Sequence, residues 1–143
     1  MHDLVLQTVA KLIIPFIQLF GFYIIFFGHV SPGGGFAGGT IVASSFILYA
    51  LAYDVQAGFK RMPRLVAKWL ESMGALLFVL VGLAGLLMGA NFLANHTGLV
   101  DMGQAGTLLS GGLIPLLTLA VGVKVASTII SLFYHLLEEK THD

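Results

Sequence analysis

Cysteine is absent from the sequence, and charged residues are scarce. Without cysteine the chain can form no disulfide and no thiolate metal site, and it lacks the ligands that usually hold an iron–sulfur cluster. Charged residues make up 10% of the chain, against roughly 25% in a soluble domain. Because seven acidic and seven basic residues cancel, the chain also lacks the positive excess typical of nucleic-acid binding. Both a soluble domain and a nucleic-acid partner are disfavoured.

Apolar residues are correspondingly abundant in the sequence. They account for 57% of the 143 residues, and four stretches are long enough to cross a hydrocarbon core of about 30 Å as helices. The predicted spans are residues 4–28, 36–53, 65–93 and 109–137. The sequence therefore predicts an all-α integral membrane bundle of four transmembrane helices, forming a single membrane domain over residues 1–143 in the lipid bilayer.

Basic residues between the second and third spans set the predicted orientation. Lys60, Arg61, Arg64 and Lys68 cluster there, whereas the connections after the first and third spans contain no Lys or Arg. Because short basic connections stay on the cytoplasmic side, we expect both the N- and the C-terminus to be cytoplasmic.

Lys124 is the most unusual ionisable residue. It lies near the middle of the predicted fourth span, roughly 20 Å along the helix axis from Leu137. A charge at this depth costs at least about 2.5 kcal/mol, so the amine should be paired, hydrated or neutral. Burial also eases the release of its proton, as an ion carrier requires. The alternative is a structural lysine that pairs with carbonyl groups or a carboxylate.

Three further ionisable residues are candidates for an ion path. Lys11 lies about 10 Å into the first span, and its stem can reach the cytoplasmic interface. Glu71 has Lys68 three residues before it on the same helical face, which predicts a local pair near the cytoplasmic side. His29 closes the first span, where its imidazole can cap the last carbonyl groups or respond to external pH. For these three, interfacial placement and helix capping are the favoured interpretations.

A glycine-rich connector joins the first two spans. Glycine removes the Cβ barrier to positive φ and permits close backbone approach, while Pro32 fixes its own φ. Gly33, Gly35 and Gly38 also fit the pattern Gly-x-Gly-x-x-Gly. A dinucleotide site needs a short strand before these glycines, and here a long apolar run precedes them. The connector therefore predicts a specific backbone shape and no nucleotide cofactor.

Small residues recur at four-residue spacing in the predicted spans. Because lipid provides little hydrophobic force between helices, their association depends on close backbone approach at such positions. These pairs predict tight helix contacts, either within this chain or with other subunits: Gly35 and Gly39, Gly39 and Ala43, Gly85 and Gly89, Gly122 and Ala126.

The connector and the fourth span resemble a known family. The connector reads Gly28-His29-Val30-Ser31-Pro32-Gly33-Gly34-Gly35-Phe36-Ala37-Gly38-Gly39. It is similar to the signature Gly-His-x-x-Pro-Gly-Gly-Gly-Phe-x-Gly-Gly of the MnhB/MrpB subunit of multisubunit cation/proton antiporters. Gly122-Val123-Lys124-Val125 likewise resembles that family's Gly-x-Lys-Val segment. Length and four-span layout agree, so the resemblance covers essentially the whole chain. The motif residues that it carries over are Pro32, Gly33, Gly34, Gly35, Phe36, Gly38 and Gly39.

The resemblance implies a small multi-pass subunit of the Mrp (also Mnh or Sha) complex, which exchanges sodium for external protons across the bacterial plasma membrane. Its partners would be the other membrane subunits, its transported ions Na⁺ and H⁺, and it would hold no cofactor. One role is an ion path shared with other chains, which would supply the carboxylates that a hard cation needs. The other is a scaffold, in this complex or in a related hydrogenase-type respiratory membrane complex. An enzyme is least favoured, because no nucleophile, base and orienting residue form a visible set.

Overall fold

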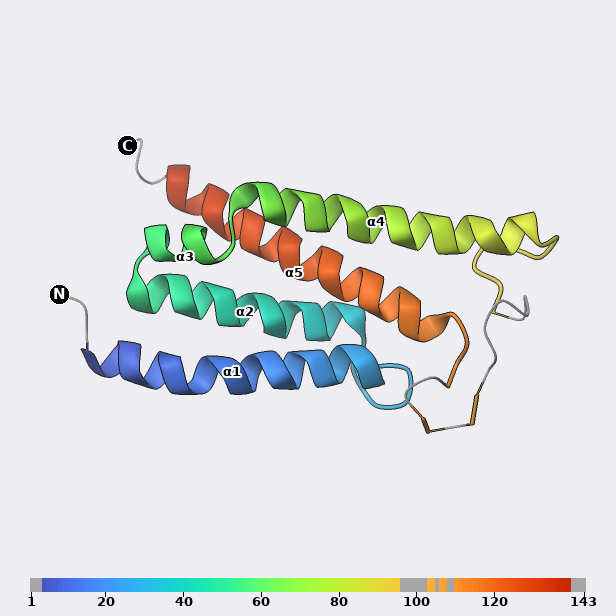
Figure 1. Cartoon of the computed structure of the whole chain (residues 1–143), viewed down its shortest axis with the longest axis horizontal. Helices are drawn as coiled ribbons and strands as arrows, with labels where there is room; N and C mark the ends of the chain where they lie inside the picture. The colour runs from blue at the N-terminus through green and yellow to red at the C-terminus, as the bar shows by residue number, and fades with distance from the viewer. Residues whose placement is uncertain (1–3, 96–102, 105, 108–109, 140–143) are drawn as a thin grey trace.

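Five helices make up the regular structure of the described residues. The computed structural model describes residues 4–95, 103, 104, 106, 107 and 110–139, with the backbone alone at 138 and 139. In chain order the helices are α1 (Leu4–Phe27), α2 (Gly35–Tyr53), α3 (Val55–Arg61), α4 (Arg64–Leu87) and α5 (Ile114–Glu139) (Figure 1). All except α3 are long and apolar enough to cross a membrane. The predicted all-α bundle of four membrane-crossing helices is confirmed.

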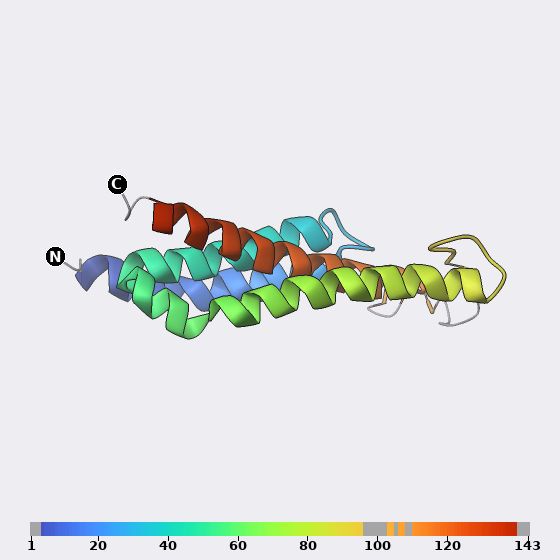
Figure 2. The same ribbon diagram turned by 90° about the horizontal axis from the view of Figure 1, so that it is seen from above.

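The four long helices lie along one axis and alternate in direction (Figures 1 and 2). Helix α1 packs against α2, α2 against α5, and α5 against α4, with a smaller contact between α1 and α5. The last helix of the chain is therefore inserted between α2 and α4. Among the described residues, α4 lies at the edge of the bundle and has α5 as its main neighbour.

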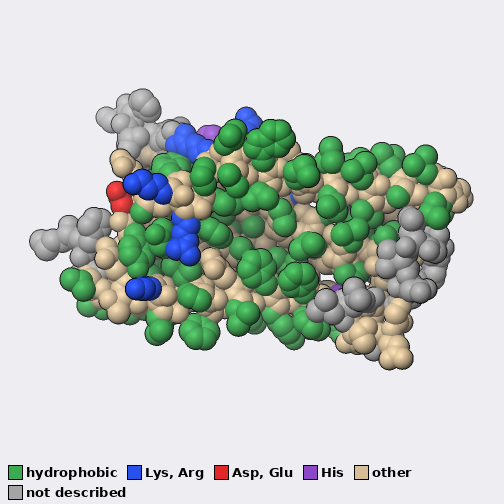
Figure 3. Space-filling model, in the orientation of Figure 1, with side chains coloured by type: hydrophobic (Ala, Val, Ile, Leu, Met, Phe, Trp, Pro, Cys, Tyr) green, Lys and Arg blue, Asp and Glu red, His purple; other side chains and the backbone are tan. Residues whose placement is uncertain are grey.

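Helix α1 begins and helix α5 ends at one end of the bundle, together with α3 (Figure 1). Lys and Arg side chains also gather there (Figure 3). We call this the basic end, after Lys60, Arg61, Arg64 and Lys68, and the opposite end, where α1 passes into α2, the connector end. Placing the start of α1 and the end of α5 on one side agrees with four membrane crossings, while the cytoplasmic identity of that side stays a prediction.

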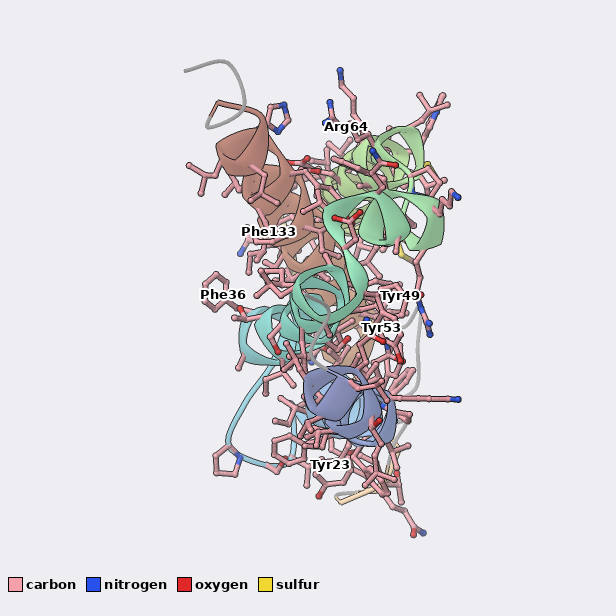
Figure 4. All side chains as sticks on the ribbon, turned by 90° about the vertical axis from the view of Figure 1, so that its left-hand side faces the viewer. Tyr23, Phe36, Tyr49, Tyr53, Arg64 and Phe133 are labelled. Atoms are coloured by element: carbon pink, nitrogen blue, oxygen red, sulfur yellow. The ribbon has the colours of Figure 1, made fainter. Side chains whose placement is uncertain are left out.

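The helix α3 is not predicted by the sequence patterns, because seven residues are too few for a periodic signal. Asp54 begins it, since a carboxylate oxygen accepts a hydrogen bond of 2.7 Å from the backbone N–H of Val55. Two cation–π contacts hold α3 and the start of α4 at the basic end. Arg61 lies 4.6 Å from the ring centroid of Tyr49, and Arg64 lies 4.5 Å from that of Phe59 (Figure 4).

The predicted third span, 65–93, is longer than α4. The chain leaves the helix after Leu87, and Gly89 then adopts a φ of +75°. Phe92 folds back so that its ring occupies the space where a Cβ on Gly82 would lie. The segment after Leu87 is thus a turn that covers the end of α4 rather than a further helical turn.

The predicted fourth span, 109–137, begins earlier than α5. Gly111 and Gly112 have φ values of +97° and +65°, outside the helical range. Asn95 fixes this turn, because its side-chain amide donates to the carbonyl of Gly111 at 2.9 Å and accepts from the N–H of Leu113 at 2.8 Å. Helix α5 starts directly after this turn, at Ile114.

Large apolar side chains cover the outside of the bundle (Figure 3). The buried positions between helices are mostly small, as in the cluster of Ala10, Ile14 and Ala52 between α1 and α2. A second cluster, Ala43, Ile130 and Tyr134, lies between α2 and α5. Small residues inside and large apolar residues outside are the arrangement expected when lipid is the solvent.

Candidate functional site

An ion pair joins α4 to α5 within their membrane-crossing segments. Lys124 Nζ lies 3.7 Å from Glu71 Oε1. Thr128, one turn after Lys124 on α5, donates its hydroxyl hydrogen to the same carboxylate oxygen at 2.8 Å. Lys124 Nζ in turn donates to Thr128 Oγ1 at 3.5 Å. Amine, hydroxyl and carboxylate form a triangle, which we call the Lys124 triangle.

A glycine on α4 allows these side chains to meet. Gly74 lies one helical turn after Glu71 and is buried. A Cβ there would lie 2.8 Å from the carbonyl oxygen of Ala120 and 2.8 Å from Lys124 Cβ. The backbones of α4 and α5 therefore approach closely at this level, and the Lys124 stem runs beside α4 toward Glu71.

The Lys124 triangle lies well inside the predicted membrane. Glu71 is seven residues after Arg64, the first residue of α4, or about 10 Å along the helix axis. Gly74, which is level with Lys124 Cβ, is about 15 Å along it, half of a hydrocarbon core of about 30 Å. Lys124 thus lies near the middle of the length of α4, and its amine points back toward Glu71 and the basic end.

One expectation about these residues is corrected. Helical spacing predicts that Glu71 pairs with Lys68 on its own helix, but its ion pair in the structure is with Lys124 on α5. Contact between α4 and α5 decides this pairing, because it places Glu71 beside α5.

A cavity of about 280 Å³, lined by residues with polar groups, lies between α4 and α5 on the basic-end side of the Lys124 triangle. We call it the basic-end cavity. Its lining residues are Arg64, Lys68, Glu71, Ser131, Tyr134 and His135. Glu71 therefore borders a cavity whose other lining residues include Arg64 and Lys68 of the basic end.

A second hollow of about 310 Å³ lies between the same helices, farther from the basic end. Its lining is apolar and consists of Gly74, Ala75, Phe78, Val79, Ala120, Val121 and the stem of Lys124. Lys124 and Glu71 thus stand between the basic-end cavity and this apolar hollow. Their side chains are 42% and 34% exposed in the isolated chain, so the pair is not sealed inside the fold.

Three polar residues of α5 were missed as site residues by the sequence reasoning. Thr128 donates its hydroxyl hydrogen to Glu71 on α4. Ser131 and His135 line the basic-end cavity. Their spacing could have identified them, because Lys124, Thr128, Ser131 and His135 follow one another at intervals of four, three and four residues, as along one helical face.

His29 lies at the connector end, remote from the Lys124 triangle. Its Nε2 is 3.2 Å from the carbonyl oxygen of Thr107 and 3.2 Å from Ser110 Oγ. Since the Ser110 hydroxyl already donates to the Thr107 carbonyl at 2.7 Å, the geometry assigns the ring hydrogen to Nε2. Nδ1 is buried without a hydrogen-bond partner among the described residues.

The capping role expected for His29 belongs instead to Ser31. The Ser31 hydroxyl and backbone N–H donate to the carbonyl of Phe27, the last residue of α1, at 3.0 and 2.9 Å. His29 ties the end of α1 to the segment before α5. Lys11, the fourth candidate, is exposed on α1, which packs mainly on α2. Of the four candidates, the structure brings together Lys124 and Glu71.

The connector motif divides into three kinds of position. Gly33 and Gly34 have φ values of +149° and +130°. Gly35, Gly38 and Gly39 are buried where α2 crosses its neighbours, and a Cβ on Gly39 would lie 2.5 Å from the carbonyl oxygen of Gly122. Pro32 and Phe36 are exposed, and Phe36 points away from the bundle (Figure 4).

Comparison with known proteins gives consistent matches. Residues 5–131 match a family model described as a domain related to the MnhB subunit of Na⁺/H⁺ antiporter. The chain is 42% identical to a Na⁺/H⁺ antiporter subunit of Bacillus subtilis (strain 168) over 97 residues, covering 68% of this chain and 67% of that protein. It is 37% identical to a protein of Staphylococcus haemolyticus (strain JCSC1435) named for the antiporter subunit mnhB2, over 107 residues and 75% of each chain.

A solved structure has the same fold. It is the membrane-bound sulfane sulfur reductase, an archaeal respiratory membrane complex, one chain of which matches with a TM-score of 0.79 and 34% sequence identity. The match covers 94% of the present chain and 58% of the archaeal one.

Proposed function

Because this chain belongs to the MnhB family of Na⁺/H⁺ antiporter subunits, we propose that its Lys124 triangle forms part of the ion path of such an antiporter. The chain is a multi-pass membrane subunit of a transporter rather than an enzyme. We further propose that it acts as one membrane domain in a bacterial plasma membrane, where other membrane subunits complete a complex that exchanges Na⁺ for H⁺. The names of its relatives support these finer points.

The observation that carries the proposal is the Lys124–Glu71 ion pair, which lies within the candidate membrane-crossing segments and is only partly covered by the rest of the chain. Ionisable groups within a membrane span are costly and commonly mark ion or proton paths. A pair that only held helices together would gain most by being closed off from its surroundings. Here the Lys124 and Glu71 side chains keep 42% and 34% of their surface exposed and border two hollows. Glu71 borders the basic-end cavity and Lys124 the apolar hollow, so neither side chain is enclosed by the fold.

A scaffold role is the second candidate, and the edge position of α4 favours it. Since α4 has α5 as its main neighbour among the described residues, the ion pair between them could hold α4 in place. Breaking one partner of a buried pair is strongly destabilising. In that role the pair would matter for assembly and not for the movement of ions.

Substitutions of Lys124 distinguish the two roles. The variants Lys124→Ala and Glu71→Gln should each lower Na⁺-dependent exchange in everted vesicles by roughly 100-fold, as loss of a proton-transferring side chain does. A native-gel blot should show the complex at its normal amount. Lys11→Ala is the matched control, because it removes a lysine that is exposed on α1, and it should leave exchange unchanged.

Arginine at position 124 separates the roles further. Lys124→Arg keeps a positive charge beside Glu71 but holds its proton permanently. A proton-exchanging site should remain inactive in this variant, whereas a purely structural pair should be restored. Recovery of both complex and exchange in Lys124→Arg would contradict the ion-path proposal and support the scaffold role.

A further inference from the structure

We propose that the basic-end cavity is a water-filled vestibule that delivers protons, and not sodium, between the basic end and the Lys124 triangle. The inference deepens the proposed function and rests on it. The proposed function gives the Lys124 triangle a part in an ion path. The further inference adds that the ion is the proton and that it arrives from the basic end.

The lining of the cavity supports hydration. Its volume of about 280 Å³ has room for several water molecules. Polar groups of both helices face it: Arg64, Lys68 and Glu71 from α4, and Ser131, Tyr134 and His135 from α5. A space of this size with several donors and acceptors satisfies the conditions under which internal water is stable.

A series of hydroxyl and charged groups on α5 leads from the basic end toward the Lys124 triangle. On α5, Ser131 precedes His135 by four residues and follows Thr128 by three, so the three side chains lie along one face. Thr128 then donates to Glu71 Oε1 at 2.8 Å, and Lys124 Nζ lies 3.7 Å from that oxygen. Water in the cavity would complete a hydrogen-bonded route from His135 to the Lys124 amine.

The same lining disfavours sodium. Hard cations in proteins are held by several oxygen ligands, and among the described residues the cavity lining offers one carboxylate. Its Oε1 already accepts the hydrogen bond of the Thr128 hydroxyl and faces the Lys124 amine. The ammonium group of Lys68, which also lines the cavity, adds positive charge to it. Protons pass along water and hydroxyl groups without such a ligand set, so they fit this route better than Na⁺.

The polar route stops at Lys124. Beyond it toward the connector end, Phe78 and Val79 of α4 and Ala120 and Val121 of α5 line the second hollow. These residues offer no side-chain donor or acceptor. Within this part of the chain the vestibule therefore opens to one side, the basic end.

Cysteine labelling tests the access of water, and the natural chain contains no cysteine that would interfere. In the assembled complex in vesicles, Ser131→Cys should react from the basic-end side with water-soluble methanethiosulfonate reagents. Because Lys68 lines the cavity, the anionic reagent should react about tenfold faster than the cationic one. Val121→Cys, in the apolar hollow, is the matched control and should react only with a membrane-permeant maleimide.

Failure of this inference is distinguishable from failure of the proposed function. If Ser131→Cys reacts only with the permeant maleimide, lipid or another subunit fills the cavity and the vestibule is overturned. The Lys124→Ala result is independent of that outcome. If Ser131→Cys is labelled but its modification leaves exchange unchanged, the cavity is wet but carries no protons, and the inference also fails.

A second variant tests the assignment to protons. Ser131→Leu should fill part of the cavity and lower the maximal exchange rate by about tenfold. The Na⁺ concentration for half-maximal exchange should stay the same, because sodium does not enter here. A rise of about tenfold in that concentration at normal complex levels would overturn the assignment to protons.

Discussion

Two adjacent glycines of the connector exclude side chains for different reasons. At Gly34 nothing lies within 4 Å of an added Cβ, but φ is +130°. Side chains other than hydrogen rarely adopt this backbone conformation. At Gly35, the first residue of α2, the obstacle is a neighbour, because a Cβ would collide with the carbonyl oxygen of Thr118 on α5. Backbone conformation therefore requires glycine at position 34, and helix packing requires it at position 35.

We predict that Gly34→Val destabilises the connector by about 1–3 kcal/mol, the usual cost of a residue held in a forbidden backbone region. The expected result is a lower amount of assembled complex and reduced exchange, measured by native-gel blot and vesicle assay. Ala37→Val is the matched control: Ala37 is exposed in α2, so its enlargement should be tolerated. Normal assembly of Gly34→Val would show that the connector can take another backbone shape.

At the scale of elements, α2 is held by glycines on both sides. Toward α1, a Cβ on Gly38 would lie 2.8 Å from the carbonyl oxygen of Gly21. Toward α5, a Cβ on Gly39 would lie 2.5 Å from that of Gly122. Adjacent positions on a helix point about 100° apart, so neighbouring glycines serve two different partners. The four-residue spacing of Gly35 and Gly39 accordingly marks the contact of α2 with α5 within this chain.

We predict that Gly39→Ala forces α2 and α5 apart and costs about 1–3 kcal/mol, the range for an overpacked interior. The obstacle is backbone at Gly122, which cannot rotate away as a side chain can. Thermal denaturation of the detergent-solubilised complex should show a lower midpoint. Ser44→Val, at an exposed position of α2, should leave the midpoint in place, and an unchanged midpoint in Gly39→Ala would refute the close crossing.

At the scale of the molecule, charge is divided between the two ends. The basic residues lie at the end where α1 begins and α5 ends (Figure 3), whereas residues 28–34 and 88–95, at the connector end, include no Lys or Arg. The positive-inside rule assigns the basic end to the cytoplasm. The basic-end cavity would then face the cytoplasm and His29 the exterior.

We predict opposite labelling of cysteines placed at the two ends. In intact cells a membrane-impermeant maleimide should label Val30→Cys at the connector end and leave Gln56→Cys, on α3, unlabelled until the membrane is permeabilised. Both positions are exposed, so access within the chain does not limit the reaction. The reverse pattern would invert the orientation and, with it, the side from which the basic-end cavity opens.

Much of the molecule follows from the sequence because the information is local. Apolar runs determine the four long helices, and the start and end of α2 are predicted within one residue. The glycines of the connector indicate an unusual backbone, which Gly33 and Gly34 adopt. Position within a span also places the Lys124 backbone deep in the membrane. Each inference concerns one segment and its solvent, so it needs no knowledge of how segments are arranged.

The partners of the ionisable groups were decided by the tertiary structure. Helical spacing favours Lys68 as the neighbour of Glu71, but the contact that forms is with Lys124, 53 positions away. His29 likewise meets Thr107 and Ser110 instead of its own helix. Spacing along one helix shows which residues share a face, yet it does not reveal which helix that face meets or at what height. Close packing of α4 on α5 at Gly74 determines which helix Glu71 faces and at what height along it. This packing therefore brings Lys124, Thr128 and Glu71 together.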